Sequence, residues 1–294
     1  MEGAAGVKLA LDPAMLKAEP MESVMAAVAD AGYGYAEVSN RDDFIGAFGP
    51  VRASRDDLAR VRRAAQAAGV EIVSVAIIQA WSHPDEDLRS QAVGWWRDGI
   101  EAVAKLGCQR INTELSGDPD RPAECAAAFR RSIEELLPLL EREGIEVVAE
   151  PHPNDFVETT AAGVDLIRSL GSTRVRYLHC IPHSFYLGGS VRSQVEYARG
   201  SFDHVHIADT FRPGRTILNP QGTGVRVHEH FDIGRGEIDW SEVGDALGAV
   251  GFDGVLTVQV FGWEERAALS FRQNREALER LFRLPQGSRG GTDR

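Results

Sequence analysis

Two histidines and an aspartate fall within the stretch 202–210, FDHVHIADT, whose β-branched residues otherwise indicate a buried strand. Side chains alternate between the two faces of an extended strand, so His204 and His206 share one face and Val205 points to the other. One face of this strand is therefore polar. Imidazole side chains on such a face are able to bind a metal ion or to transfer a proton near neutral pH.

Seven of the eight histidines lie near the carboxyl end of a strand-like run or in the loop that follows one. They are His152, His179, His183, His204, His206, His228 and His230. Glu114, Glu150 and Asp209 stand at matching places. Carboxylates and imidazoles that converge from separate strand ends suit a divalent cation such as Mn²⁺, Mg²⁺ or Zn²⁺. We therefore expect a metal site, although any one of these histidines alone is equally compatible with a satisfied polar residue at a strand end.

Short apolar runs alternate with amphipathic patterns along the chain. The strand-like runs are 7–12, 35–39, 71–78, 110–115, 146–151, 175–180, 202–208 and 254–260, and the helical patterns are 21–31, 55–68, 85–106, 121–143, 159–170, 191–199, 239–250 and 263–282. Eight βα units in about 270 residues predict an α/β fold, a single (β/α)8 TIM barrel whose strands present their carboxyl ends at one rim. An open doubly wound sheet competes, but no GxGxxG follows the first strand.

Two segments interrupt the alternation. Residues 212–236 form a long connection after the seventh strand, and a loop of that length in a compact domain is usually functional or disordered. The C-terminal residues 285–294, PQGSRGGTDR from Pro285 on, have the composition of a disordered tail. We therefore predict one catalytic barrel domain over residues 1–284.

The composition of the chain indicates where the protein is located and which classes of partner it does not bind. The net charge of −12 argues against a nucleic-acid backbone as the main partner. No apolar run is long enough to span a bilayer, and the N-terminus lacks the pattern of a signal peptide, so we expect a cytoplasmic protein with no membrane partner. Cys108, Cys125 and Cys180 form no CxxC pair and are expected to be reduced.

Arginines and aromatic residues are candidates for substrate contacts. Arg235 is one of four arginines in or beside the long loop that could bind a phosphate or a carboxylate, the others being Arg212, Arg215 and Arg226. Trp81 lies just beyond the third strand, where its ring could stack on a sugar. Loop arginines are more often solvated, and about half of such aromatic rings only pack.

Four motifs, taken together, resemble the xylose-isomerase-like TIM-barrel superfamily. They are EVVAEPH around Glu150, CIPH ending at His183, HVHIAD at 204–209, and GRGEIDW at 234–240. The superfamily includes sugar phosphate isomerases and epimerases, ketose 3-epimerases, inosose dehydratases, endonuclease IV type nucleases and subunits of C-glycoside-cleaving enzymes. The resemblance covers nearly the whole chain and implies the same barrel.

The resemblance also implies a set of metal ligands. They would be Glu150, a residue of the sixth strand, His206 and a residue of the eighth strand. The chain departs from the family twice, because Cys180 stands at the usual aspartate position and Gln259 at the usual glutamate position. Cys180 is either a thiolate ligand or a small thiol that fills the barrel, and His179 beside it is the alternative residue to face the metal. Mn²⁺ is the implied ion, with Mg²⁺, Zn²⁺ and Co²⁺ as alternatives.

Family members that epimerise ketoses use two metal-bound glutamates, one on each face of the substrate. Gln259 cannot take a proton, so another base must serve or the reaction differs. His152 is the leading candidate for that base, and His183 keeps the family's substrate-facing position. His230, in a segment that resembles the zinc-binding loop of endonuclease IV, is a candidate second-metal or substrate ligand, as is Glu114. The nuclease interpretation lacks histidines on the second and third strands.

The resemblance favours a metal-dependent isomerase or epimerase of a ketose, cyclitol or keto-sugar. A lyase of the same fold, either a dehydratase or a C-glycoside-cleaving subunit with His152 as base, is the alternative. A non-catalytic binding subunit is a remote third. The expected partners are a small sugar or cyclitol and either a second copy of the chain or a partner subunit.

Overall fold

We describe the protein from a computed structural model, which covers residues 6–39, 41, 44–45, 50–212 and 230–282. The predicted tail 285–294 and residues 213–229 of the long loop, with Arg215, Arg226 and His228, lie outside the described residues. The chain divides into two compact units. The first contains Met1–Glu37, Ala64–Ile72 and His179–Arg294, and the second contains Val38–Arg63 and Val73–Leu178.

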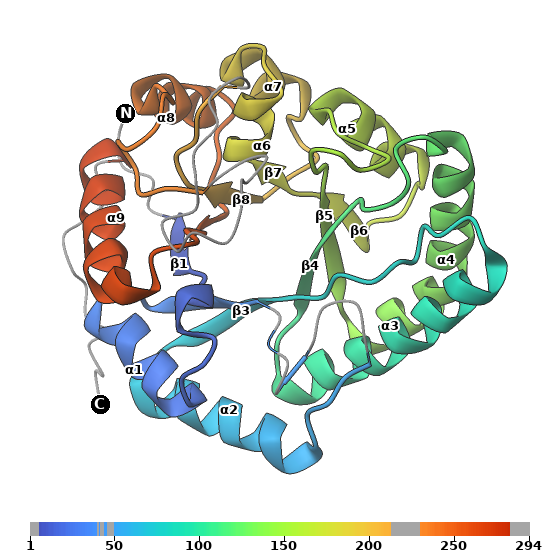
Figure 1. The fold of residues 1–294 in the computed structure, drawn as a ribbon, viewed down its shortest axis with the longest axis horizontal. Coiled ribbons are helices and arrows are strands. Elements are labelled where there is room, and N and C mark those ends of the chain that lie inside the picture. Colours follow the sequence, from blue (N-terminus) through green and yellow to red (C-terminus); the bar gives the residue numbers. More distant parts are fainter. Residues whose placement is uncertain (1–5, 40, 42–43, 46–49, 213–229, 283–294) are drawn as a thin grey trace. The chain divides into compact units, whose positions relative to one another are not determined.

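The predicted barrel is confirmed. In the described residues, nine parallel strands follow the order β6-β5-β4-β3-β2-β1-β9-β8-β7, and helices connect successive strands except β6 and β7, as in a TIM barrel (Figure 1). The strands are β1 (Lys8–Leu11), β2 (Tyr35–Val38), β3 (Glu71–Ala76), β4 (Arg110–Glu114), β5 (Glu146–Glu150), β6 (Val175–Tyr177), β7 (His179–Cys180), β8 (His204–Ile207) and β9 (Val255–Val258).

The helices match the predicted patterns to within a few residues. They are α1 (Met21–Asp30), α2 (Arg55–Ala68), α3 (Glu86–Leu106), α4 (Pro122–Glu143), α5 (Thr160–Ser169), α6 (Ile181–Tyr186), α7 (Val191–Tyr197), α8 (Trp240–Ala249) and α9 (Ala267–Phe282), with short 3-10 turns η1 (Ala14–Leu16) and η2 (Glu264–Arg266). Gly107 and Gly144 cap α3 and α4 at φ 87° and 69°, values that glycine adopts without strain.

In the first unit, the strands are in register over short apolar segments. β9 pairs with β1 through Leu11 and Val258, and with β8 through His206 and Thr257. Because parallel strands present their carboxyl ends on one side, the residues that follow β1, β8 and β9 share one edge of this sheet. Asp12, Asp209 and Gln259 occupy those positions.

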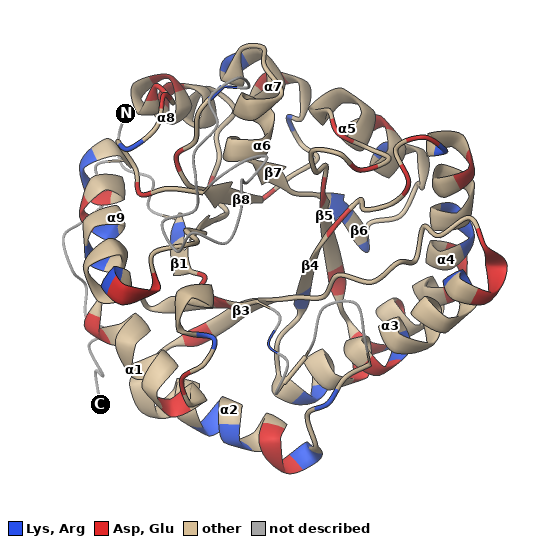
Figure 2. Ribbon diagram, in the orientation of Figure 1, with Lys and Arg blue, Asp and Glu red and all other residues tan. Residues whose placement is uncertain are grey.

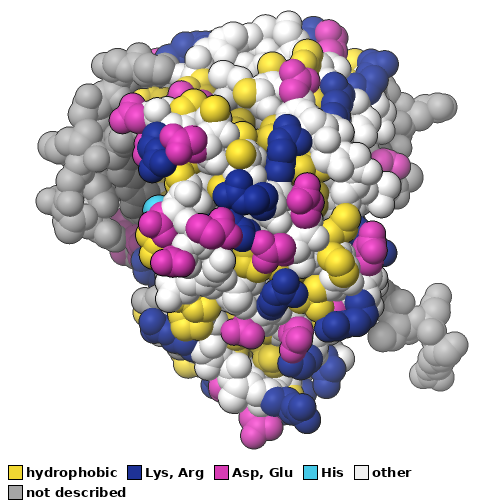
Figure 3. Space-filling view, turned by 90° about the vertical axis from the view of Figure 1, so that its right-hand side faces the viewer, with side chains coloured by type: hydrophobic (Ala, Val, Ile, Leu, Met, Phe, Trp, Pro, Cys, Tyr) yellow, Lys and Arg dark blue, Asp and Glu magenta, His cyan; other side chains and the backbone are white. Residues whose placement is uncertain are grey.

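In the second unit, aromatic packing joins α3 and α4 to the segment that follows β3. Trp81 stacks on Trp96 with ring centroids 4.1 Å apart, and the edge of Phe129 meets Trp81 at 5.0 Å. Positive and negative residues alternate along the outer faces of α3 and α4 (Figure 2). The face in Figure 3 likewise mixes basic side chains with acidic ones rather than presenting a uniformly basic surface.

The sixth strand differs from the prediction, because the expected run 175–180 is two short strands. β6 pairs with β5, whereas His179 and Cys180 of β7 pair with Val205 and His206 of β8. Leu178, between them, donates its N–H to the carbonyl of Ala149. The change of pairing partner therefore interrupts the strand.

Helix α6 was not predicted. Cys180 is its N-cap, and Pro182 lies in its first turn, where the missing N–H of proline costs nothing. Six residues are too few for a periodic pattern to reveal a helix. Among the residues that the structure describes, no helix is both long and apolar enough to cross a membrane.

Candidate active site

The two histidines of β8 contact a carboxylate from β2. Nε2 of His204 lies 3.1 Å from Oε2 of Glu37, and Nε2 of His206 lies 3.2 Å from Oε1 of the same carboxylate. His204 Nε2 also lies 2.8 Å from Oγ1 of Thr257 on β9. All three titratable side chains are at most 1% exposed. The polar strand face predicted from FDHVHIADT thus faces inward, and a buried acid accompanies it.

Glu37 is a carboxylate in this setting. Burial raises the pKa of Glu37, but the charge of His206 and hydrogen bonds from both imidazoles outweigh burial and hold the pKa far below its usual range. Sequence reasoning missed Glu37, because the strand YAEVS gives a single glutamate no special position. Its only signal was an acidic residue on the inward face of an otherwise apolar strand.

A second cluster in the first unit combines a thiol with two imidazoles. Cys180, His183 and His230 each offer a ligand atom within 4.8 Å of the others, and all three side chains are buried. Nε2 of His183 lies 3.2 Å from Nε2 of His230. Helix α6 carries His183, and its N-cap is Cys180, so the short helix positions two members of this cluster.

Main-chain and side-chain partners orient the ring of His230. Its Nδ1 lies 2.8 Å from the carbonyl oxygen of Gln259, and its ring stacks on Phe261 with centroids 5.0 Å apart. A carbonyl oxygen can only accept, so Nδ1 carries the proton and Nε2 presents a lone pair when the ring is neutral. Histidines that bind metals in proteins almost always have a partner of this kind on the second ring nitrogen.

Gln259 is buried at the end of β9. Its amide Nε2 donates to Oδ2 of Asp12 at 3.4 Å, and Oδ1 of Asp12 accepts from the main chain of Ala14 at 3.0 Å. Asp12 is fully buried and was also missed from the sequence, although it directly follows the first strand. The amide of Gln259 therefore pairs with a buried acid.

His179 does not share the surroundings of Cys180. Its side chain is fully buried, and its ring lies 5.7 Å from that of Phe202. Burial lowers the pKa of His179 to about 4, so this imidazole is neutral at physiological pH. The Cys180–His183–His230 and Glu37–His204–His206 groups contain no atom of His179.

A third group lies in the second unit, where Glu114, His152 and Asp155 offer ligand atoms within 4.8 Å of one another. Nδ1 of His152 is 3.1 Å from Oδ2 of Asp155. Burial lowers the pKa of His152, but Asp155, Glu114 and Glu150 outweigh burial and raise it to about 9. The sequence predicted a neutral general base at this position, whereas the raised pKa favours the protonated imidazole at pH 7.

Glu150 and Trp81 also belong to the second unit, and both are buried. Glu150 ends β5 with 4% of its surface exposed, and its carbonyl accepts from the main chain of Leu115 at 2.7 Å. Trp81 is fully buried against Trp96 and Phe129. Trp81 was expected to face a sugar, but its ring is used in packing α3 against α4.

Asp209 also has a structural role instead of the expected ligand role. Its carboxylate accepts hydrogen bonds from the main chain of Thr210, Gly234 and Ile238 and from the indole of Trp240, at 2.8–3.2 Å. This aspartate therefore joins the HVHIAD and GRGEIDW motifs into one folded loop. Arg235 in that loop is exposed.

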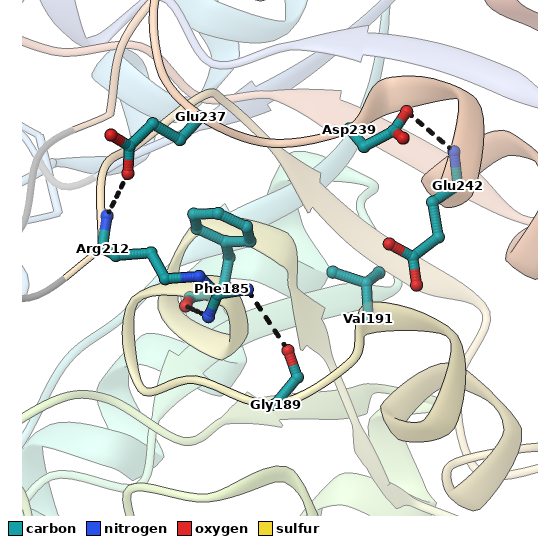
Figure 4. A pocket seen from close by; sticks show the side chains of 7 residues that line it. All are labelled: Phe185, Gly189, Val191, Arg212, Glu237, Asp239 and Glu242. Atoms are coloured by element: carbon teal, nitrogen blue, oxygen red, sulfur yellow. Dashed lines mark hydrogen bonds between the residues drawn. The ribbon is translucent and has the colours of Figure 1, made fainter.

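A pocket of about 340 Å³ lies beside α6, α7 and the start of α8 (Figure 4). Arg212 lines it together with three acidic residues, Glu237, Asp239 and Glu242. The Arg212 guanidinium donates to the carbonyl of Phe185 at 3.2 Å and lies 4.1 Å from the centroid of its ring. Arg212 is thus engaged with its own chain.

The donor sets fit a divalent transition metal. Thiolate and imidazole ligands suit Zn²⁺, whereas Mg²⁺ and Mn²⁺ prefer oxygen ligands. The buried Cys180, His183 and His230 group has this soft composition, and the hydrogen bond on His230 Nδ1 leaves Nε2 directed at the cluster. The residues present therefore satisfy the chemical requirement for metal binding.

Among curated proteins, the chain resembles a sugar epimerase. A curated relative, D-psicose 3-epimerase of Ruminiclostridium cellulolyticum, is 23% identical over 197 residues, which cover 62% of this chain and 60% of the relative. The chain thus aligns with less than two thirds of that relative.

Solved structures share the fold at low identity. D-psicose 3-epimerase from Clostridium cellulolyticum H10 with D-tagatose has a TM-score of 0.76 at 16% identity, covering 94% of this chain and 99% of that one. The IOLI protein with a bound zinc atom gives 0.73 at 18%, covering 94% and 98%. The 3-keto-D-glucoside 4-epimerase YcjR from E. coli gives 0.70 at 15%, covering 94% and 99%.

The sequence profile of one family extends over most of the chain. It matches residues 25–281 and is that of the xylose isomerase-like TIM barrel. The match includes β2 and β8, which carry Glu37, His204 and His206, and α6, which carries His183. This chain therefore belongs to the xylose isomerase-like TIM-barrel family.

Proposed function

We propose that the protein is a divalent-metal-dependent sugar isomerase or epimerase that acts on a ketose, cyclitol or keto-sugar. The observation that carries the proposal is that Cys180 and His206, two of the proposed ligands, are register partners on the neighbouring strands β7 and β8 and are both buried. The sugar epimerases among the relatives support the same class of reaction.

The proposed metal ligands are Glu150, Cys180, His206 and Gln259. Glu150 belongs to the second unit, and the other three belong to the first. A bound divalent ion would polarise a substrate carbonyl and so acidify the adjacent C–H bond. Mn²⁺ is the ion implied by the family pattern, whereas the thiol of Cys180 favours Zn²⁺.

Proton transfer must be asymmetric in this chain. Glu150 is a carboxylic acid and can carry a proton, but the amide of Gln259 cannot. We propose Glu150 as the base on one face of the substrate and His183 as the group that exchanges a proton on the other. His183 shares a short Nε2–Nε2 contact with His230, so a proton taken up by one imidazole is stabilised by the other. Glu114 and His179 have no assigned step.

The second candidate is a lyase, favoured by Gln259. Loss of one of two acid–base carboxylates leaves proton removal on a single face, which suffices for β-elimination. The sequence predicts His152 as the base of such a lyase, and its raised pKa of about 9 makes the neutral imidazole the minor form at neutral pH.

Isotope exchange separates these reactions. The protein is incubated with a ketose and a 3-keto-glycoside in D₂O, in the presence of Zn²⁺ or Mn²⁺. Deuterium at the carbon next to the carbonyl, with no group lost, supports the epimerase. An unsaturated product or a released aglycone supports the lyase.

Variants test the ligand assignment. Glu150→Gln and His206→Ala should each lower the exchange rate by about 10²-fold or more, because each removes a metal ligand. Glu134→Gln, on an exposed part of α4, is the matched control and should keep the wild-type rate. Full activity of both ligand variants, or no bound metal and no exchange in the wild type, favours a non-catalytic binding subunit.

A further inference from the structure

Glu37 on β2 bridges the two histidines of β8, and all three residues belong to the first unit. One carboxylate oxygen lies 3.1 Å from His204 Nε2, and the other lies 3.2 Å from His206 Nε2. Glu37 and His204 are fully buried, and His206 is 1% exposed. Both carboxylate oxygens are thus used by the two strand-eight histidines of the family motif.

This geometry determines which ring nitrogens carry protons. Carboxylate oxygens accept hydrogen bonds, so the 3.1 and 3.2 Å contacts with Glu37 favour the tautomer of each imidazole that has its N–H at Nε2. A neutral imidazole has a single N–H, and a ring protonated at Nε2 therefore presents its lone pair at Nδ1. The contact with Glu37 selects this tautomer for His206.

His204 holds the carboxylate in place. Its contact with the other oxygen, together with the 2.8 Å contact between His204 Nε2 and Thr257 Oγ1, prevents the carboxylate from rotating away from His206. Metal-binding histidines commonly have such a carboxylate partner, which fixes ring orientation and increases the basicity of the ligating nitrogen.

We propose that Glu37 is a positioning residue for metal binding, which directs Nδ1 of His206 toward the ion by accepting a hydrogen bond from Nε2. This inference rests on the proposed function, because it takes His206 as a metal ligand. His204 has a supporting role and contributes no ligand atom. Glu37 touches neither substrate nor metal.

The first readout needs no metal. In metal-free wild-type protein labelled with ¹⁵N-histidine, His206 should show the chemical shifts of a ring protonated at Nε2 and bare at Nδ1. The assignment uses a His206→Gln sample to identify the missing signals. A His206 ring protonated at Nδ1 in the wild type would overturn the proposal without any variant of Glu37.

The second readout is metal affinity. Glu37→Gln removes the charge at nearly constant volume, and Glu37→Met removes the acceptor altogether. Each should weaken Zn²⁺ binding by about 10–100-fold, with Glu37→Met at the larger end. Circular dichroism and urea unfolding establish that each variant is folded before titration.

A matched control separates positioning from general stability. Glu146 at the start of β5 is another strand glutamate in ion pairs, 2.6 Å from Arg110 and 3.4 Å from Arg176. Glu146→Gln should lower the stability of the protein and leave the Zn²⁺ dissociation constant within about twofold of the wild type. The affinity loss should be confined to the Glu37 variants.

The outcomes distinguish this inference from the proposed function. If the wild type binds Zn²⁺ and both Glu37 variants bind it equally well, the positioning role is wrong and the metal-dependent function stands. If the wild type itself binds neither Zn²⁺ nor Mn²⁺, the proposed function fails, and the positioning role fails with it.

Discussion

Gln259, where the family resemblance predicts a glutamate, is a neutral side chain beside a buried acid. Gln259 donates to Asp12 at 3.4 Å, and both side chains are buried. An amide next to a buried carboxylate costs little, whereas a second carboxylate at that position would face a like charge. Gln259 is thus a neutral hydrogen-bond partner for Asp12.

Gln259→Glu should therefore make the protein depend on metal for stability. Without metal, two facing carboxylates should lower the free energy of unfolding by about 1–3 kcal/mol. With excess Zn²⁺ or Mn²⁺, the loss should be largely recovered. Urea unfolding with and without metal checks this. Gln273→Glu on the exposed part of α9 is the control, and equal stability of Gln259→Glu and the wild type without metal would contradict the prediction.

His179 predicts a dependence of stability on pH. Burial lowers the pKa of His179 from 6.5 to about 4 in the folded protein, so the unfolded chain takes up the proton first as pH falls. The contribution of His179 to the free energy of unfolding is fully present above pH 6.5, is lost as the pH falls from 6.5 to 4, and changes no further below pH 4. The loss over this range is about 3 kcal/mol.

The comparison of wild type with His179→Gln isolates this effect from other titrating groups. Urea unfolding at intervals between pH 7 and 4 should show the steeper decline in the wild type. Parallel curves for the two proteins would show that His179 has similar proton affinity in both states.

At the scale of elements, the loop after β8 depends on close packing around Asp209. A Cβ added to Gly236 would meet the Asp209 carboxylate and the backbone of Thr210, too close for either to remain in place. Gly244 within α8 has only the carbonyl of Leu281 near it, at an ordinary contact distance. Gly236 and Gly244, eight residues apart, therefore differ in whether they tolerate a side chain.

Alanine at these positions should have opposite effects. Gly236→Ala should lower the free energy of unfolding by about 2–4 kcal/mol, since it displaces hydrogen bonds to a buried carboxylate. Gly244→Ala should be neutral or stabilising by up to about 1 kcal/mol, because alanine favours a helix. Thermal unfolding of both variants measures the difference, and a Gly236→Ala variant as stable as Gly244→Ala would contradict the packing described here.

Most elements were predictable from the sequence, because strand-like runs and helical periodicity agree with the glycine stops at Gly107 and Gly144. The exceptions involve non-local pairing. Leu178 interrupts the sixth strand because it bonds to β5 while its successors pair with β8. Local patterns contain no information about such a change of partner.

Candidate-site residues that belong to a motif could be predicted from the sequence. Residues whose role depends on contacts with distant parts of the chain could not. His183, His206 and His230 stand in recognisable motifs. Glu37 stands in an ordinary strand, and its meaning arises only from contacts with residues more than 160 positions away in the chain. The raised pKa of His152 likewise comes from three carboxylates, only one of which, Glu150, was adjacent in the motif.

At the scale of the whole molecule, metal binding should couple to folding. A ligand that binds only the native state stabilises it by about 2.7 kcal/mol at a free concentration one hundred times its Kd. Treatment with a chelator should therefore lower the Tm, and added Zn²⁺ should restore it. Exposed Glu134→Gln should respond as the wild type does, whereas His206→Ala should show no recovery.

The metal content of the purified protein tests the central claim most directly. Elemental analysis of the wild type, Glu150→Gln and His206→Ala, each dialysed against metal-free buffer after loading with Zn²⁺ or Mn²⁺, measures whether these two residues hold one ion. We predict about one equivalent in the wild type and less than about a tenth of that in either variant. A wild type without metal, or either variant with a full equivalent, would contradict the account.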